Sequence, residues 1–346
     1  MHDRIAPADA AARFGWYRPP AARAAAAAVV LLGCAGQTAA QVDPEALRTQ
    51  LRAELQQGTF AHYIAGVVNL TERPDVASAR YRVDGDERTD VSTFKLPIEF
   101  DVLDLGHDRA LFVEGAAGYL RTETRVADIV GGGAPALATQ VDARVEAVSA
   151  LAGVGLRLPL LPGLSVEPIA GVGGAYIDSR ARYAGPGAPT IAPVLDGIAF
   201  NWNATTVNAT ASLRLSYELD LGRDHALQLA SRYSYTRTWT VESTDVAQNA
   251  DVGTHLLAQR AELSGPTGLE LMDESLRWRT TVGHYWLPDD GGTALGFRDY
   301  FELGAGLEAD VTAFGLPIDK LRVGGAYFIG ERLEGWSVGI GVSLAW

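Results

Sequence analysis

The clearest structural signal in the sequence is the C-terminal stretch Trp336-Ser337-Val338-Gly339-Ile340-Gly341-Val342-Ser343-Leu344-Ala345-Trp346. Every second residue in it is large and apolar, and the residues between them are small. Because side chains alternate between the two faces of a β-strand, this pattern puts all the large side chains on one face. The stretch therefore predicts a long strand with one apolar face.

Three further segments, 207–221, 301–311 and 321–329, show the same alternation, with Leu213 on an apolar face and Arg214 on a polar one. The segments are longer than the roughly five or six residues usual for soluble strands. The polar faces combine charges with small residues, and the connectors alternate between short and long. These features favour an all-β fold, a transmembrane antiparallel up-and-down β-barrel, over a soluble sandwich.

The alternating segments predict twelve strands, an even number as in bacterial outer-membrane barrels. They are expected at 59–70, 91–104, 110–126, 140–158, 164–183, 203–221, 226–242, 253–264, 275–287, 296–312, 318–329 and 335–346. The long connectors are expected outside, at 71–90, 127–139, 184–202 and 243–252. The connector 265–274 is an exception, because it is long but would lie on the periplasmic side. The alternation in the fourth strand slips near Ala147, which suggests a bulge.

Residues 1–40 have the pattern of a secretory signal. Arginines precede the apolar run 24–35, and small residues at 38–40 follow it. We expect cleavage after Ala40. The sequence around Cys34 also resembles a lipoprotein box, so this cysteine is either lipidated or removed with the signal.

Residues 41–58 are expected to hold a short helix. Asp43-Pro44-Glu45 provides a capping residue, a proline suited to the first turn and an acid at the positive end of the helix dipole. Leu47, Leu51 and Leu55 then recur every four residues and form a narrow apolar stripe. The expected organisation is a signal at 1–40, a periplasmic or lumenal helix at 41–58 and a barrel at 59–346.

The composition argues against several other classes. The 346 residues include one Cys, which rules out an internal disulfide framework and Cys₄ zinc sites. The formal net charge of −13 argues against nucleic-acid binding. The six histidines form no H-x₃-H or H-E-x-x-H pair, and no His-x-Ser-Asn occurs. We therefore predict no metal, no cofactor and no catalytic residue.

A signal, a helix and about twelve strands that end on an aromatic residue resemble the translocator domain of autotransporters. Because only 41–58 separates the signal from the barrel, the closest resemblance is to solitary, passenger-less autotransporter-like barrels. The resemblance implies a Gram-negative outer membrane, contact with its lipids and lipopolysaccharide, and recognition by the barrel assembly machinery; we expect a monomer. The C-terminal assembly signal would comprise Trp336, Val338, Ile340, Val342, Leu344 and Trp346.

If the apolar faces contact lipid, the opposite faces carry charges of both signs into the lumen. The expected lumen-lining residues are Glu99, Asp101, Glu114, Arg144, Glu146, Arg214, Glu218, Arg232, Arg277, Arg279, Glu302, Glu308 and Arg322. These charges either pair and close the interior or line a wetted pore, since twelve strands lie between filled and open barrels.

The helix bears on the same question. By resemblance it either plugs the pore, with Arg48, Arg52 and Glu54 meeting lumen charges, or lies outside the periplasmic mouth. The expected role is structural or interaction-based, with an occluded lumen. The alternatives are a small-solute channel and an outer-membrane lipid-modifying enzyme.

Overall fold

The computed structural model of the chain describes residues 43–57, 60–72, 79–83, 89–126, 138–271, 274–310 and 320–343. In chain order its elements are α2 (Pro44–Gln57), α3 (Phe60–Glu72), β1 (Ala79–Val83), β2 (Thr89–Gly106), β3 (Arg109–Val126), β4 (Gln140–Leu161), β5 (Leu164–Ala184), α4 (Ala188–Leu195), β6 (Trp202–Gly222), β7 (His225–Ser243), η3 (Val246–Gln248), β8 (Asp251–Leu271), β9 (Glu274–Trp286), α5 (Asp290–Leu295), β10 (Asp299–Asp310), β11 (Lys320–Gly330) and β12 (Leu333–Ser343). The expected signal at 1–40, with Cys34, lies outside the described residues, as do Leu344 and Trp346.

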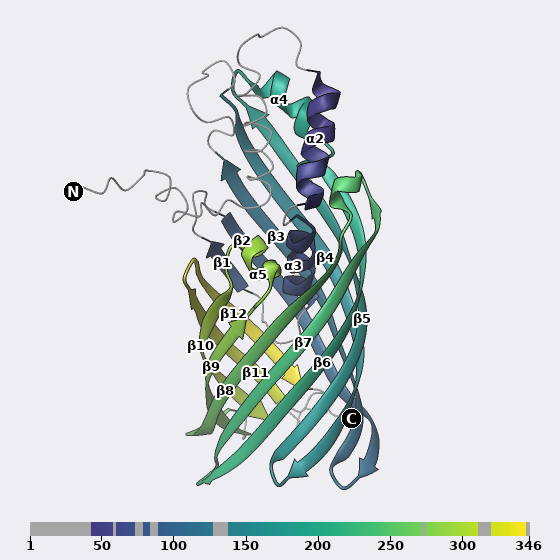
Figure 1. The fold of residues 1–346 in the computed structure, drawn as a ribbon. Helices are drawn as coiled ribbons and strands as arrows, with labels where there is room; N and C mark the ends of the chain where they lie inside the picture. The colour runs from purple at the N-terminus through teal and green to yellow at the C-terminus, as the bar shows by residue number, and fades with distance from the viewer. Residues whose placement is uncertain are drawn as a thin grey trace, which may run out of the picture.

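The strands form a closed antiparallel barrel in which each strand pairs with its neighbours in sequence (Figure 1). The short strand β1 closes the barrel, because Ala79 pairs with Thr93 of β2 and with Ser337 of β12. Large apolar side chains such as Leu303 and Trp336 cover the outer surface, as a lipid-facing wall requires. The predicted fold class and the number of strands are therefore confirmed. Within the described residues, no helix has the length and apolar character needed to cross a membrane.

The two ends of the barrel differ. At the turn end, two-residue turns join β2 to β3, β4 to β5 and β6 to β7. Both residues of the first turn, His107 and Asp108, have φ of 58°, and Arg223 and Asp224 repeat this conformation in the third, as tight hairpins need. At the helical end, the connectors contain α4, η3 and α5, and α2 packs on α4 and η3.

The wall is also taller on one side. β4 has 22 residues and β5 and β6 have 21 each, whereas β11 and β12 have 11 each. The longer strands extend beyond the shorter ones at the helical end (Figure 1).

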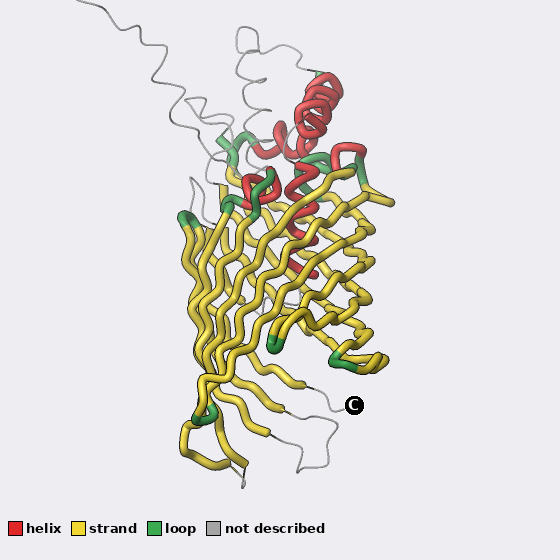
Figure 2. The backbone as a smooth tube through the Cα atoms, turned by 60° about the horizontal axis from the view of Figure 1, so that its bottom comes forward, coloured by secondary structure: helices red, strands yellow, loops and turns green. Residues whose placement is uncertain are grey.

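The expected first strand at 59–70 is wrong, because this segment forms the helix α3. The six consecutive residues from Ile64 to Asn69 are all buried, so this part of the helix is enclosed on every face. The helix contacts β2, β3, β4, β5, β7 and β8. With α5 packed against it as well, α3 lies inside the closed barrel, as Figure 2 shows.

Two connectors also differ from the expectation. The segment 71–90, expected as an outer loop, contains the end of α3 and the strand β1. The segment 265–274, expected as a long periplasmic connector, is mostly strand, because β8 continues to Leu271 and β9 begins at Glu274. The helix predicted from the Leu47, Leu51 and Leu55 stripe is confirmed as α2, and the three leucines are buried.

Gly118 of β3 tests the position of α3. A methyl group at Gly118 would overlap the carbonyl oxygen of Thr71, a backbone atom of α3 that cannot rotate away. We expect Gly118→Ala to lower the free energy of unfolding by about 1–3 kcal/mol, because α3 must shift. Urea titration of the barrel in detergent, followed by gel migration of unboiled samples, measures the change.

Gly304→Ala is the matched control. Gly304 also faces the lumen, but its added methyl group would meet Thr281 at 3.4 Å, an ordinary contact. We expect this variant to stay within about 0.5 kcal/mol of the parent. Equal urea midpoints for the two variants would contradict the packing of α3 on Gly118.

Candidate functional site: the filled lumen

The helix α3 lies inside the lumen, in the half toward the helical end. Ile64 and Val68 are fully buried, and the Phe60 ring packs edge-on against Trp202 with 5.6 Å between centroids. Asn69 donates a hydrogen bond from Nδ2 to Thr254 Oγ1 of β8 at 2.5 Å. The helix is therefore held by apolar packing and by at least one polar contact with the wall.

The strands around α3 turn apolar side chains inward. On β4 these include Val141, Val145 and Ala147, which belong to the same buried cluster as the α3 residues. The intervening positions of β4, Arg144 and Glu146, consequently face outward. The structure thus corrects the expectation that these two residues line the lumen. No change of phase occurs near Ala147, since the β3–β4 register runs unbroken.

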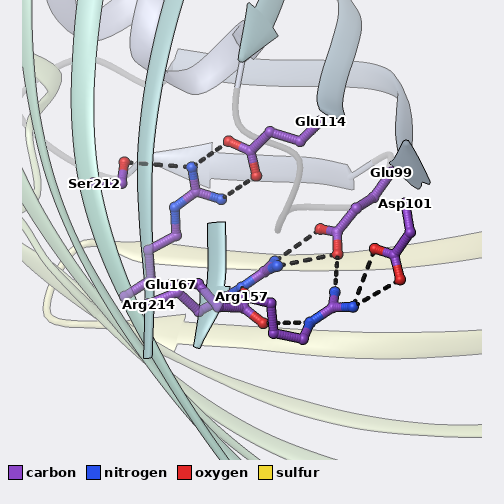
Figure 3. Close-up of polar contacts among 8 residues, drawn as sticks. Glu99, Asp101, Glu114, Arg157, Glu167, Ser212 and Arg214 are labelled. Carbon is purple, nitrogen blue, oxygen red and sulfur yellow. Dashed lines mark hydrogen bonds and ion pairs between the residues drawn. The ribbon is translucent and has the colours of Figure 1, made fainter. Parts of the chain in front are cut away.

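Ion pairs cross the lumen on the turn-end side of α3. Arg232 of β7 binds Glu114 of β3 through both terminal nitrogens, at 2.5 and 3.0 Å, although β4, β5 and β6 separate the two strands in the sheet. The two side chains are only 7% and 3% exposed. Arg232 also donates to Ser212 Oγ at 3.3 Å. This buried pair therefore joins two strands that are not neighbours in the sheet; Figure 3 labels its Glu114 and the nearby Ser212.

A second cross-lumen cluster adjoins the first. Arg214 of β6 donates two hydrogen bonds to Glu99 of β2, at 2.9 and 3.0 Å, and pairs with Glu167. Arg157 of β4 bonds both oxygens of Asp101 at 3.0 Å and Glu167 at 2.8 Å (Figure 3). Each guanidinium thus bridges carboxylates from different strands, the geometry that makes such pairs strong.

The Phe112 ring lies against this cluster. Its centroid is 5.3 Å from the guanidinium carbon of Arg157 and 5.3 Å from that of Arg214. The ring adds a cation–π contact to each arginine.

A third cluster lies on the wall formed by β8 to β11. Glu308 accepts from Arg279 and from Arg322, the latter at 2.7 Å, and lies 3.5 Å from the Lys320 ammonium. Arg279 also pairs with Glu262. These neighbours on adjacent strands form one connected network.

The remaining expected lumen residues lie on inward positions nearer the two ends. Arg277 donates to the Asp224 carbonyl at 2.8 Å near the turn end. Glu302 accepts from Tyr285 Oη at 2.6 Å near the helical end, and Glu218 is exposed beside the turn between β4 and β5. The structure thus brings together Glu99, Asp101 and Arg214, pairs Glu114 with Arg232, and joins Arg279, Glu308 and Arg322.

Sequence reasoning missed Arg157, Glu167 and Glu262 as lumen residues. An unbroken alternation from Val145 would have placed Arg157 on the inward face, because both positions are odd-numbered in β4.

The structure places the three residues of the expected plug helix elsewhere. Arg48 donates to the carbonyl oxygens of Pro193 and Asp196, at 2.6 and 3.0 Å, and Arg52 pairs with Asp245 at 2.8 Å. These partners belong to connectors at the helical end, and Glu54 is exposed. The helix inside the barrel is α3, and α2 lies above it.

The described residues of the expected C-terminal assembly signal lie on β12. On β12, Trp336 and Val338 face outward and are exposed, and the backbones of Ile340 and Val342 pair with β11. Over the part of the chain that the structure describes, no group of three or more His, Cys, Asp or Glu residues could hold a metal ion.

The Glu114–Arg232 pair allows a direct test of the lumen network. We expect Glu114→Ala to destabilise the barrel by about 3–5 kcal/mol, because a buried guanidinium loses its carboxylate. The double variant Glu114→Leu with Arg232→Met should recover most of that loss. Urea titration of the detergent-solubilised barrel measures both.

The control is Asp251→Ala, which removes the carboxylate of an exposed pair with Arg237 at 2.9 Å. We expect a loss of no more than about 1 kcal/mol. If Glu114→Ala cost no more than Asp251→Ala, the cross-lumen pair would not hold the walls together.

Comparison with known proteins agrees with this architecture. Residues 71–341 match the family described as the solitary outer membrane autotransporter beta-barrel domain. No curated protein matches the sequence. Among solved structures, the transport unit of the autotransporter AIDA-I from Escherichia coli has a TM-score of 0.50 at 11% identity, covering 83% of this chain and 99% of that one.

The β domain of the Bordetella autotransporter BrkA has a TM-score of 0.49 at 16% identity, covering 78% of this chain and 96% of that one. The fold, the outward apolar wall and the family match together place the protein in the outer membrane of Gram-negative bacteria. The chain belongs to the solitary outer-membrane autotransporter β-barrel family.

Proposed function

We propose that the protein is a monomeric, non-conducting outer-membrane barrel with a structural or interaction role. The observation that carries this proposal is the burial of α3 inside the lumen, against β2 to β5, β7 and β8 and against α5. A mostly apolar helix packed into that half of the barrel supports a closed path for water and solutes there. The proposal includes no catalytic step.

The ion pairs support closure of the other half. Glu114–Arg232 and Glu99–Arg214 join strands that are not neighbours in the sheet, so their side chains extend across the interior. Opening a path there would separate charges that are partly or fully withdrawn from water, which is costly. In this proposal, α3 closes one half of the lumen and the layer of paired charges closes the other half.

The orientation follows from the connectors. Outer-membrane barrels keep short turns in the periplasm and longer loops outside. The turn end therefore faces the periplasm, and α2, α4 and η3 face the cell surface. The interaction role is assigned to this helical end, where Arg48 and Arg52 tie α2 to the connectors.

During assembly, the outer face of the last strand, β12, would be recognised. Trp336 and Val338 expose apolar side chains on its outer face, which suits recognition of the C-terminal strand by the barrel assembly machinery. Lipids of the outer membrane are the other partner of this surface.

Planar-bilayer conductance tests the proposal. The full-length barrel is expected to show no current steps, and deletion of 43–57 should leave it silent because α3 stays in place. Deletion of 43–72 should open discrete steps. Adding Glu114→Gln and Arg232→Gln to that deletion should enlarge them by removing the cross-lumen pair.

Phe60→Asp combined with Ile64→Asp is a second route to the same state, because two buried carboxylates would expel α3. Heat-modifiable gel migration confirms that each variant is a folded barrel. Steps of equal size from the full-length protein and from the 43–72 deletion would instead identify a small-solute channel.

A further inference from the structure

The outer wall of β3, β4 and β5 carries a block of charged residues at the helical end, which we call the charged block. It consists of three paired rows, one residue from each strand: Arg121, Glu146 and Asp178; Glu123, Arg144 and Arg180; and Arg125, Asp142 and Arg182. Every outward position in these rows is charged. Below them comes the row of Tyr119, Val148 and Tyr176, where the apolar wall begins.

The boundary lies at the height expected for the membrane surface. On β5, the outward positions from Val166 to Tyr176 are apolar or glycine, and the next three are Asp178, Arg180 and Arg182. Ten residues of strand rise about 33 Å along the strand, or about 25 Å along the membrane normal at a tilt of about 40°. This equals the usual height of the apolar band of such barrels, so the charged block begins where the headgroups begin.

Contacts with the rest of the protein do not explain why these outward positions are charged. The inward residues between them, such as Val141 and Val145, already bury against the lumen cluster. The outward side chains pair mostly with each other, as in Arg125–Asp142 at 2.7 Å and Arg180–Asp178 at 2.6 Å. Arg125 and Arg180 remain 74% and 73% exposed, so much of each guanidinium is free to bind a ligand.

The opposite wall lacks this arrangement over its described length. On β10 and β11 the outward residues near the helical end are mainly apolar, namely Phe301, Tyr327 and Ile329, with Asp299 at the start of β10. The middle row continues outward through Asp90 of β2 and Arg82 of β1 to Glu334 of β12, whereas three fully charged rows occur on β3, β4 and β5.

We propose that the charged block binds the phosphorylated headgroups of lipopolysaccharide in the outer leaflet. Guanidinium groups present paired N–H donors that match phosphate oxygens. The four carboxylates interspersed among five arginines suit the divalent cations that bridge neighbouring phosphates, since hard cations take oxygen ligands. The tall wall would thus be held by its surrounding lipid along one side. The inference rests on the proposed orientation, with the helical end at the cell surface.

The test uses full-length barrel refolded in detergent without lipopolysaccharide, titrated with fluorescently labelled lipopolysaccharide. The variant Arg144→Gln with Arg180→Gln removes two arginines from the middle row. The matched control, Arg109→Gln with Arg223→Gln, removes two exposed arginines at the turn end. All three proteins should remain heat-modifiable, because exposed ion pairs contribute little to stability.

We expect the Arg144/Arg180 variant to bind about tenfold more weakly than the parent, and the control to bind as the parent does. Lipopolysaccharide with its lipid A phosphates removed should bind the parent as weakly as the intact lipid binds the variant. Equal affinities for variant and control, or no effect of dephosphorylation, would overturn the proposal.

The same samples separate this inference from the proposed function. A silent, heat-modifiable barrel with unaltered lipopolysaccharide affinity in the Arg144/Arg180 variant would refute the docking surface alone. Weaker binding in the Arg109/Arg223 control, with the Arg144/Arg180 variant unaffected, would place the turn end outside and refute the orientation on which both rest.

Discussion

The burial of α3 inside the barrel determines which residues the surrounding strands can turn toward the lumen. A helix has a diameter of about 10–12 Å with its side chains, and this one is apolar on nearly every side, with Ile64 and Val68 fully buried. The strands that surround it therefore present mainly apolar or small residues inward, with polar contacts such as Asn69 to Thr254 among them. Gly118 marks the tightest approach, because a methyl group there would meet the helix backbone.

On the turn-end side of α3, the same strands enclose a part of the lumen in which the described part of the chain places no helix. Their inward side chains face each other across the lumen without a helix between them, and charges fill the space. Such charges are tolerated because each has partners: Glu167 lies between Arg157 and Arg214, and Glu114 accepts two bonds from Arg232. Leaving any one of them unpaired would cost more than the pair contributes. The polar half of the lumen is thus a connected network.

The sequence predicts most of the barrel, because a lipid-facing wall imposes a period of two wherever water-filled or charged space lies behind it. Leu213 and Leu303 were placed on the outer face for this reason, and they are exposed there. The rule fails at 60–72, since a helix that is apolar all round has no polar face to reveal its period. Within the candidate site, Glu99 and Arg214 could be predicted to face inward, but their contact across the lumen depends on the diameter and stagger of the barrel.

Arg144 and Glu146 were expected to face the lumen but belong to the charged block on the outer wall, and one change along β4 accounts for both facts. Apolar residues face outward where the strand crosses lipid and inward where it surrounds α3, so the apolar set of β4 changes sides although its phase is unbroken. Val145 points in and Val148 points out, on opposite faces of one regular strand. A change of the apolar residues from outward to inward positions along one strand therefore indicates two boundaries. One is the edge of the membrane on the outer wall, and the other is the start of an apolar group inside the lumen. In this protein the two boundaries lie at the same height. The tall wall has apolar residues on its inner face there and the charged block on its outer face, at the proposed height of the lipid headgroups.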